Sequence, residues 1–422
     1  MRLPLATNEG LNFMTRSFLF RRRPQYVACA LLLMPMLSGQ SAGLEPSAPA
    51  QANAGQEGTM LGVTHCGGLY YFTKDPYIVE GALAIQTAGF PAAKFWLTNL
   101  AHVYPHNSDW NLSPDASLVD MASHPYLQRV LDLPFQTIAL EVQEARWRGW
   151  VKKEGFAINP DSDFSEDERQ MRELTAWLLR RYADEPRTFI LQNWEGDWMF
   201  WSKDREAWRR GEHPDLAERT GAFVRWIDAR QRGVEAGRRD VPESKARVLH
   251  AVEVNQVLAA KDGVPCLTTE VLPKVKPDLV SWSCYDGMRL DRRNAEATIE
   301  GLNEGIDILQ KYARTVEQMP GGAAVMIGEV GVPENVVPAE VTMQVLDASM
   351  QTFIRRGVPY VFYWQMFCNE REPGAESAAL PEGAAPACRG FWLVRPDGTQ
   401  SYAGAFFEKE LVETKKSRNQ TR

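Results

Sequence analysis

Two glutamates stand at the ends of short apolar segments, where a carboxylate can face a cleft instead of the core. Glu329 follows the run Ala323–Ile327 within the sequence GEVG, and Glu195 follows the run Thr188–Gln192. The glycines beside Glu329 allow a ligand to approach the backbone closely. Two carboxylates flanking a glycosidic bond suffice for its hydrolysis. The pair therefore predicts sugar chemistry if the fold brings the two segments together; otherwise each glutamate is a solvated strand-end acid.

Other polar and aromatic side chains follow further apolar segments. Amides and charged groups can bind the hydroxyls of a sugar, and aromatic faces can cover its apolar C–H face. We expect such contacts from His65, Lys94, Asn193, Asp197, Trp198, Asn255, Tyr285 and Trp364. The alternative for the aromatic residues is ordinary core packing. Glu141 and Glu253 are expected to point into the fold, where Lys94 or another base would neutralise them.

The elements that must position these residues alternate in type along the chain. Short apolar runs of strand type occur at Met60–Thr64, Ala93–Leu97, Thr137–Val142, Thr188–Gln192, Arg247–Val254, Leu279–Cys284, Ala323–Ile327 and Tyr360–Gln365. Helical patterns occur at Pro76–Thr87, Ser165–Tyr182, Leu216–Gly237, Asn294–Thr315, Pro338–Arg355 and Tyr402–Leu411, and a small hairpin is expected over Leu393–Ser401. Strands joined by helices are parallel, and eight such units predict an α/β fold of the (β/α)8 TIM-barrel class. An open doubly wound sheet is the alternative, although it lacks a glycine-rich phosphate motif here.

The first 50 residues resemble a targeting segment more than a folded one. Three arginines, Arg21 to Arg23, precede the apolar run Tyr26–Leu37, and small-residue sites follow at Ala48 to Ala50. This is the layout of a secretory signal peptide, which predicts a secreted or periplasmic protein. We expect a signal peptide and cleavage region at 1–50, a linker at 51–58, the barrel at 59–412 and a polar tail at 413–422.

Charge and motifs limit the partners. Without residues 1–50, which carry five arginines and two glutamates, the net charge is −10. Such a charge disfavours nucleic acid and anionic membranes, and we expect no stable membrane insertion once the signal is removed. The chain contains no CxxC, no HExxH and no cofactor fingerprint, so we expect neither a metal nor a cofactor. Composition does not determine the oligomeric state.

Five cysteines follow residue 50, and two of them bracket a loop rich in glycine, proline and alanine. These are Cys368 and Cys388. In an oxidising compartment they are the expected disulfide, which would fix a loop at the rim of the site. The alternative is that all five are buried thiols.

In these motifs the chain resembles the retaining glycoside hydrolases of the (β/α)8 clan A superfamily. Glu329 in GEVG resembles the nucleophile strand of that clan. The resemblance implies that Tyr285 hydrogen-bonds the nucleophile and that Trp364 forms the floor of the −1 sugar subsite. Lys94 stands roughly where the clan commonly has an arginine.

The resemblance is broken at the fourth strand. The clan has asparagine directly before the acid/base glutamate, whereas Trp194 here separates Asn193 from Glu195. Asp197 therefore remains an alternative acid/base.

The resemblance predicts a secreted retaining glycosidase that acts on an oligosaccharide or polysaccharide. A non-catalytic carbohydrate-binding or structural barrel of the cell envelope is the alternative, because a fold does not fix a function. Such a barrel would not need Glu195 and Glu329 to converge. A hydrolase of another bond is disfavoured, since no Ser-His-Asp or Cys-His signature is evident.

Overall fold

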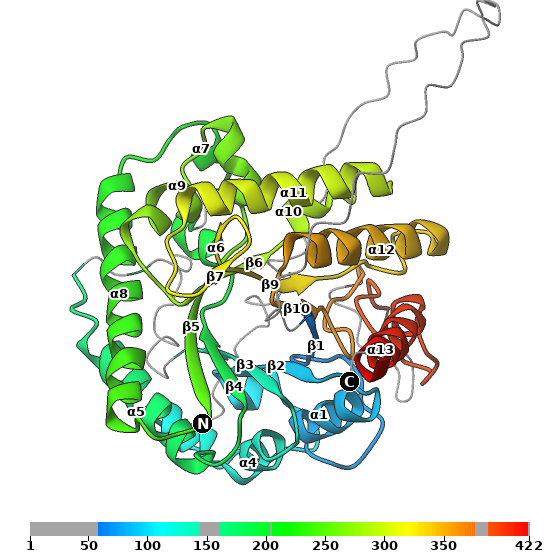
Figure 1. The fold of residues 1–422 in the computed structure, drawn as a ribbon, viewed down its shortest axis with the longest axis horizontal. Coiled ribbons are helices and arrows are strands. Elements are labelled where there is room, and N and C mark those ends of the chain that lie inside the picture. The colour runs from blue at the N-terminus through cyan, green and yellow to red at the C-terminus, as the bar shows by residue number, and fades with distance from the viewer. Residues whose placement is uncertain are drawn as a thin grey trace, which may run out of the picture. The chain divides into compact units, whose positions relative to one another are not determined.

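Eight parallel strands close into a barrel in the computed structural model (Figure 1). The structure describes residues 58–143, 158, 161–202, 205–372, 374–375 and 387–420, with side chains described as far as residue 412. The strands are β1 (Met60–Thr64), β2 (Ala92–Leu97), β3 (Thr137–Val142), β4 (Thr188–Gln192), β5 (Arg247–Val254), β6 (Leu279–Ser283), β9 (Val325–Val330) and β10 (Tyr360–Tyr363). They follow one another in chain order and β10 pairs with β1, so the predicted TIM barrel is confirmed and the open sheet is wrong.

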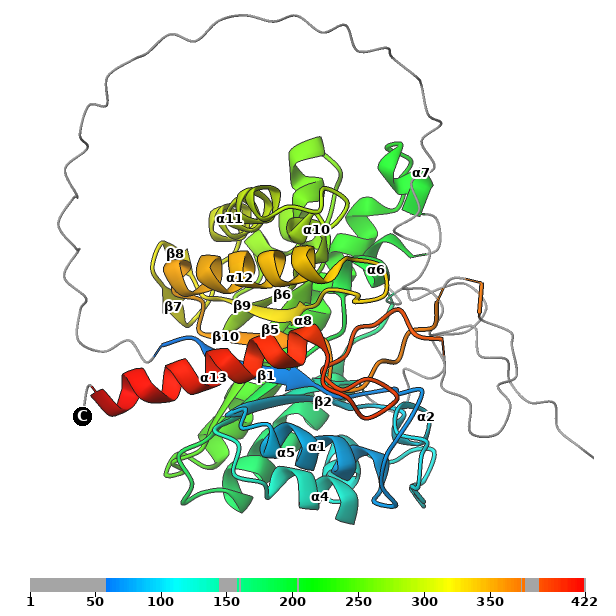
Figure 2. The ribbon, with the colours of Figure 1, turned by 90° about the vertical axis from the view of Figure 1, so that its right-hand side faces the viewer.

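Helices surround the barrel on its outer side, as Figures 1 and 2 show from two directions. The longer ones are α1 (Tyr77–Thr87), α4 (Pro125–Leu131), α5 (Ser165–Arg181), α8 (Leu216–Asp240), α11 (Ala295–Tyr312), α12 (Ala339–Arg356) and α13 (Tyr402–Gln420). Shorter helices lie in the connections: α2 (Leu100–Val103), α3 (Leu118–Ala122), α6 (Gly196–Trp201), α7 (Arg205–Arg209), α9 (Leu267–Glu270), α10 (Tyr285–Met288) and the 3₁₀ turns η3 (Val257–Asp262) and η4 (Leu272–Lys274). None of the helices in the described part of the chain has the length and hydropathy to cross a membrane.

The α5 and α8 helices show how the sequence sets the packing of this outer layer. Acidic residues fill the first turn of α5 and Arg180 and Arg181 its last turn, which suits the helix dipole. On α8, a Cβ at Gly233 would lie 2.4 Å from the Glu168 carbonyl, and one at Gly237 would lie 2.7 Å from the Arg172 carbonyl. The two glycines therefore allow the helices to approach one another closely.

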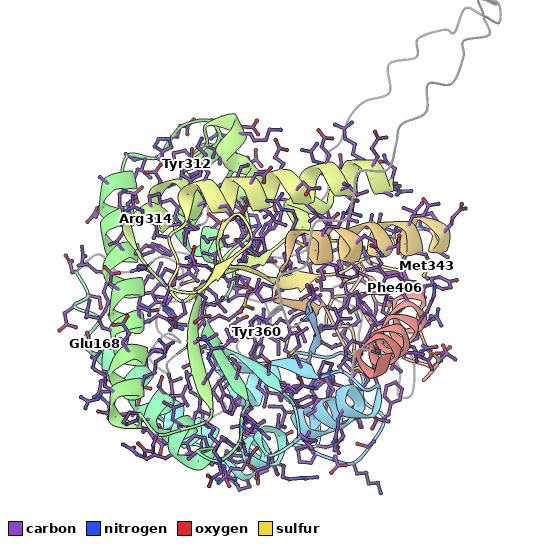
Figure 3. The ribbon with its side chains drawn as sticks, in the orientation of Figure 1. Glu168, Tyr312, Arg314, Met343, Tyr360 and Phe406 are labelled. Carbon is purple, nitrogen blue, oxygen red and sulfur yellow. The ribbon has the colours of Figure 1, made fainter. Side chains whose placement is uncertain are left out.

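Side chains fill the space between the barrel and its helices (Figure 3). Phe406 of α13, labelled in that figure, is buried, whereas Met343 of α12 is partly exposed. The predicted hairpin near Asp397 is present as an antiparallel bridge between Val394 and Gln400. Helix α13 continues past the predicted end at Leu411, so the backbone of 413–420 is helical. The predicted signal peptide at 1–50 and nearly all of the linker lie outside the described residues.

The seventh barrel strand is displaced from its predicted position. The segment Gly322–Ala323 (β8) pairs antiparallel with Gln318–Met319 (β7) as a small hairpin, and the barrel strand β9 begins only at Val325. Because β9 continues to Val330, Glu329 lies within the strand instead of beyond it. Its Cα pairs with Ser283 of β6, just after a shift in register.

Candidate active site

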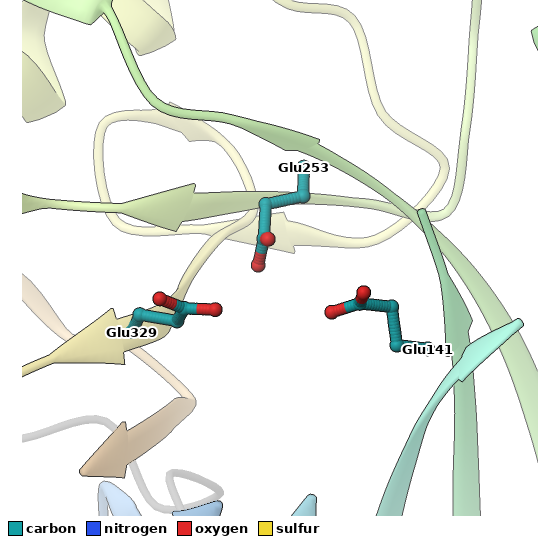
Figure 4. Close-up of side chains that lie close together, drawn as sticks. All are labelled: Glu141, Glu253 and Glu329. Carbon is teal, nitrogen blue, oxygen red and sulfur yellow. The ribbon is translucent and has the colours of Figure 1, made fainter. Parts of the chain in front are cut away.

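Three carboxylates converge on the ammonium group of Lys94 in the barrel interior. Lys94 Nζ lies 3.3 Å from Glu253 Oε2, 3.3 Å from Glu329 Oε1 and 3.6 Å from Glu141 Oε2. Figure 4 shows the three carboxylates, from β3, β5 and β9, pointing toward a common centre. All four side chains are fully buried. Three convergent carboxylates could also hold a metal ion, but here the Lys94 ammonium group already supplies a positive charge among them.

Burial and mutual repulsion decide the charges of this cluster. Burial alone would lower the pKa of Lys94, but the carboxylates of Glu253, Glu329 and Glu141 outweigh it and raise the pKa above its ordinary value. Burial raises the pKa of Glu141 and that of Glu329, and Lys94 only partly opposes the shift. The lysine therefore stays charged. Among the carboxyl groups, burial and mutual repulsion favour the protonated form.

Glu195 joins this cluster from the loop between β4 and α6. Its N–H donates to Glu253 Oε1 (3.2 Å), and its Oε1 lies at hydrogen-bonding distance, 2.7 Å, from Ser283 Oγ. The same hydroxyl oxygen lies 3.4 Å from Glu329 Oε2. One serine thus contacts both glutamates singled out from the sequence, so the fold brings them together. Burial raises the pKa of Glu195 to about 7, opposed by the Ser283 hydrogen bond and reinforced by Glu253.

Asn193 faces the neighbouring strand, not the centre of the site. Its Nδ2 donates to the Glu253 carbonyl (3.1 Å), and its Oδ1 accepts from the Glu253 N–H (3.0 Å). The side chain therefore clamps β4 to the end of β5 and fixes the backbone of an active-site glutamate.

Asp197 and Asn255 hold one another and the nearby loops. Asp197 accepts hydrogen bonds from the N–H groups of Asn255 (2.8 Å), Gln256 (3.0 Å) and Leu267 (2.7 Å). Asn255 Oδ1 accepts from the Asp197 N–H (3.1 Å). Burial raises the pKa of Asp197, and these three donors oppose the rise. The Asp197 carboxylate is committed to backbone donors, which leaves it poorly placed to give a proton to a substrate.

Tyr285 follows β6 and Trp364 follows β10, and these are the two strands that pair with β9, which carries Glu329. Burial and then the charge of Glu329 raise the pKa of Tyr285, which places the phenol near that carboxylate. The Tyr285 hydroxyl is buried but makes no hydrogen bond to any described residue, so the expected bond to Glu329 is not formed in this structure. Trp364 directly follows β10 and is fully buried, and its backbone N–H donates to the Val330 carbonyl (2.8 Å).

Trp198 lies beside Glu195 and is hydrogen-bonded to it, whereas His65 packs just after β1. His65 Nε2 lies 2.9 Å from the Tyr77 carbonyl, and burial lowers the His65 pKa to about 4, so the ring is neutral. Trp198, on α6, is almost fully buried beneath the guanidinium of Arg205, whose Cζ lies 3.5 Å from the ring centroid. His65 is therefore a packed residue just after β1, while Trp198 and Arg205 form a stacked pair beside Glu195.

Cys368 and Cys388 are both buried and both free thiols in this structure. Burial alone would raise the pKa of Cys368, but a hydrogen bond with Cys388 helps to lower it, and the same hydrogen bond and then burial raise the pKa of Cys388. Nearby, Arg389 and Glu370 form a buried ion pair at 2.6 Å. The thiols are adjacent, as a bridge requires, but the bond itself stays a prediction.

Sequence inspection missed Ser283 and Gln365. Ser283 stands two residues before Tyr285, but a single serine in an apolar strand carries no signal of its own. Gln365 Oε1 accepts from the Cys66 N–H (3.2 Å), which leaves its buried Nε2 without a partner among the described residues. An amide beside the predicted Trp364 could have been chosen from its position alone.

A cavity of about 280 Å³ lies away from these residues. Met60, Pro91 and Gln136 line it, and they stand at the starts of their strands or just before them. The carboxylate cluster lies nearer the opposite strand ends, where catalytic residues of TIM barrels are found.

Comparison with known proteins gives matches in structure only. No protein-family model matches the chain, and no curated protein matches it. GH5_18 from Streptomyces cattleya, a point variant in complex with Manb1-4GlcNAc, matches with a TM-score of 0.56 and 17% identity over 84% of this chain and 80% of that one. GH5_18 from Bifidobacterium longum matches with a TM-score of 0.54 and 14% identity over 85% and 79%.

A third match is Op5Man5, an exo-beta-1,4-mannosidase from Opitutaceae bacterium strain TAV5. Its TM-score is 0.51 at 14% identity, over 88% of this chain but 61% of that one. The first two neighbours are thus named as GH5 proteins and the third as a mannosidase. The chain shares their fold.

Proposed function

We propose that the protein is a secreted retaining glycoside hydrolase in which Glu329 is the nucleophile and Glu195 is the acid/base. The observation that carries the proposal is the Ser283 hydroxyl, which contacts an oxygen of each carboxyl group, at 2.7 and 3.4 Å. The distance between Glu195 Oε1 and Glu329 Oε2 therefore cannot exceed the sum of these two contacts. Retaining enzymes need closely spaced carboxyl groups, at ~5–5.5 Å, whereas inverting enzymes leave room for a water molecule at ~6.5–9.5 Å.

The surroundings of the two glutamates suit different roles. Burial raises the pKa of Glu329, and the Lys94 ammonium beside it opposes that rise and so favours the ionised, nucleophilic form. Burial outweighs the Ser283 hydrogen bond and the charge of Arg205, which lower the pKa of Glu195, and the resulting pKa of about 7 suits a group that must give and then recover a proton near neutral pH. In this scheme Glu329 attacks the anomeric carbon while Glu195 protonates the leaving oxygen. Glu195 then removes a proton from the water that releases the sugar.

The substrate proposal rests on the structural neighbours. Two of them are named for mannose, as a complex with Manb1-4GlcNAc and as an exo-beta-1,4-mannosidase. We therefore propose β-mannosides as the first substrates to test, within a panel of aryl glycosides and polysaccharides. A non-catalytic carbohydrate-binding barrel is the alternative, but nothing in binding alone requires a convergent pair of buried carboxyl groups.

Two substitutions test the roles. Glu329→Ala should reduce turnover of every glycoside by several orders of magnitude, because the nucleophile is lost. Glu195→Ala should retain the first step on a 2,4-dinitrophenyl glycoside, whose leaving group needs little protonation, but should accumulate the glycosyl-enzyme. Azide, which needs no base, should restore turnover and yield a glycosyl azide of retained configuration.

Glu296→Ala is the matched control, since Glu296 is an exposed glutamate on α11. It should behave as the parent protein does on every substrate. The glycosidase proposal fails if Glu195→Ala and Glu329→Ala are as active as this control, or if the parent cleaves nothing in the panel.

A further inference from the structure

Ser283 occupies a position that links the two carboxyl groups. It is the last residue of β6, it is fully buried, and its Cα pairs with that of Glu329 on β9. Its Oγ contacts Glu195 Oε1 at 2.7 Å and Glu329 Oε2 at 3.4 Å. Those are the two polar contacts recorded for this hydroxyl within the described residues.

The number of protons limits what this hydroxyl can do. A serine hydroxyl has one proton to donate and two lone pairs that accept. It cannot donate to two ionised carboxylates at the same time. Both contacts become favourable when one carboxyl group is protonated and donates to Ser283 Oγ, because the serine proton is then free for the other carboxylate.

We propose that Ser283 is a positioning residue whose hydrogen bond reverses direction during the catalytic cycle. This inference rests on the proposed function. In the free enzyme, protonated Glu195 donates to Ser283 Oγ, and the serine hydroxyl donates to ionised Glu329. After Glu195 has passed its proton to the leaving oxygen and Glu329 has become an ester, the hydroxyl rotates and donates to ionised Glu195. No covalent bond to Ser283 forms or breaks, and the serine keeps its proton throughout.

The reversal gives each glutamate a partner at the stage when it carries charge. Hydrogen bonds to an ionised group are stronger than those between neutral groups. The hydroxyl therefore supports ionised Glu329 before attack and ionised Glu195 when it must act as a base. A backbone N–H could not do this, because it only donates.

The test compares Ser283→Ala with Ser283→Thr, which keeps the hydroxyl. The measurement is the pH dependence of kcat/KM on a 2,4-dinitrophenyl glycoside from the panel, with the β-mannoside first. Because this leaving group needs little acid assistance, the acidic limb of the profile reports ionisation of Glu329. In Ser283→Ala that limb should move up by about half a pH unit, since a donor to the carboxylate is gone. Ser283→Thr should keep the parental profile.

The second readout concerns the base. Ser283→Ala should slow release of the glycosyl-enzyme by roughly tenfold, seen as a pre-steady-state burst of dinitrophenol that Ser283→Thr lacks. A merely structural role would change stability without moving the acidic limb. If Ser283→Ala does not fold, Ser283→Cys replaces it, because a thiol is a weaker donor and should shift the limb in the same direction by less.

An acidic limb that is unchanged in the Ala or Cys variant overturns the proposal. This outcome differs from failure of the proposed function, in which Glu195→Ala and Glu329→Ala themselves would leave activity intact. An upward shift of the limb in Ser283→Ala that Ser283→Thr does not correct would also overturn it, since the hydroxyl would then not be the cause.

Discussion

One ammonium group faces three carboxyl groups at the centre of this barrel, and a fourth carboxyl group lies next to them. Lys94 lies within 3.6 Å of Glu141, Glu253 and Glu329, and Glu195 is connected to them through Ser283 and Glu253. If all four were ionised, the buried cluster would carry an excess of negative charge, which is costly away from solvent. Protons must therefore be retained by some of them at neutral pH. A general acid must hold its proton at neutral pH. Burial and charge repulsion within the cluster favour that protonated form.

The retained proton has a measurable effect on stability. Glu195 has its pKa raised from 4.5 to about 7, so folding opposes its ionisation. At pH below about 4.5 the group is protonated in both the folded and the unfolded state and costs nothing. Between pH 4.5 and 7 the unfolded state loses the proton first, so the stability of the parent protein falls as pH rises.

Glu195→Gln should remove this cost, because the amide stays neutral. Relative to the parent, its free energy of unfolding should increase from pH 4.5 to pH 8 by about 1 to 3 kcal/mol. Denaturant unfolding at the two pH values measures the change, and Glu296→Gln on the exposed face of α11 is the control. A parent-to-variant difference that is the same at both pH values would contradict the raised pKa.

At the scale of single residues, the sequence identified residues whose side-chain type and position along the chain both indicate a site. Glu195 and Glu329 could be found because each stands near the carboxyl end of an apolar run, Glu195 just past β4 and Glu329 in the last residues of β9. Ser283 could not, since its importance depends on the register shift that sets it opposite Glu329. Lys94 was found as a polar residue of the site, but its three carboxylate partners come from different strands and depend on closure of the barrel.

At the scale of elements, the strands were easier to predict than the loops that follow them. Strands buried on both faces appear as continuous apolar runs, and β3, β4 and β5 have the predicted bounds. The error at β9 arose because the pair Gly321–Gly322 turns a hairpin whose second strand includes Ala323, so the apolar run contains two elements. The short helix α6 was not predicted, because it depends on contacts made by Asp197 with distant backbone.

Asp197 allows an element-scale prediction about α6. Asp197→Ala leaves the N–H groups of Asn255, Gln256 and Leu267 without their acceptor. The cost of such unpaired donors predicts a loss of roughly 2 to 4 kcal/mol in the free energy of unfolding. Activity should fall similarly on substrates with good and poor leaving groups, and azide should not restore it. Asp197→Asn keeps one acceptor and should lose less stability.

The result would separate an anchoring role for Asp197 from an acid/base role. Azide rescue in Asp197→Ala, together with activity that survives on dinitrophenyl glycosides, would assign the acid/base to Asp197 in place of Glu195. A stability loss without that pattern would leave Glu195 in the role.

At the scale of the whole molecule, closure of the barrel brings the site together. Residues from β2, β3, β5, β6 and β9 contact one another only because the strands meet in a ring. The sequence indicated eight parallel units but not which inward side chains would touch. The structural neighbours share this ring at identities of 14 to 17%, so the architecture tolerates almost complete change of sequence while the strand ends remain available for a site.

The predicted disulfide depends on where the whole chain is located, because its formation requires export to an oxidising compartment. Cys368 and Cys388 lie at the neck of one loop, beside the buried Glu370–Arg389 ion pair. Oxidation there should stabilise the exported protein by about 3 kcal/mol through closure of the loop. Reduction should therefore lower its Tm by several degrees. Cys388→Ser should have the lower Tm with or without reductant, whereas Cys266→Ser should keep the sensitivity. Five alkylated thiols in the exported, unfolded and unreduced protein would show that no bridge forms.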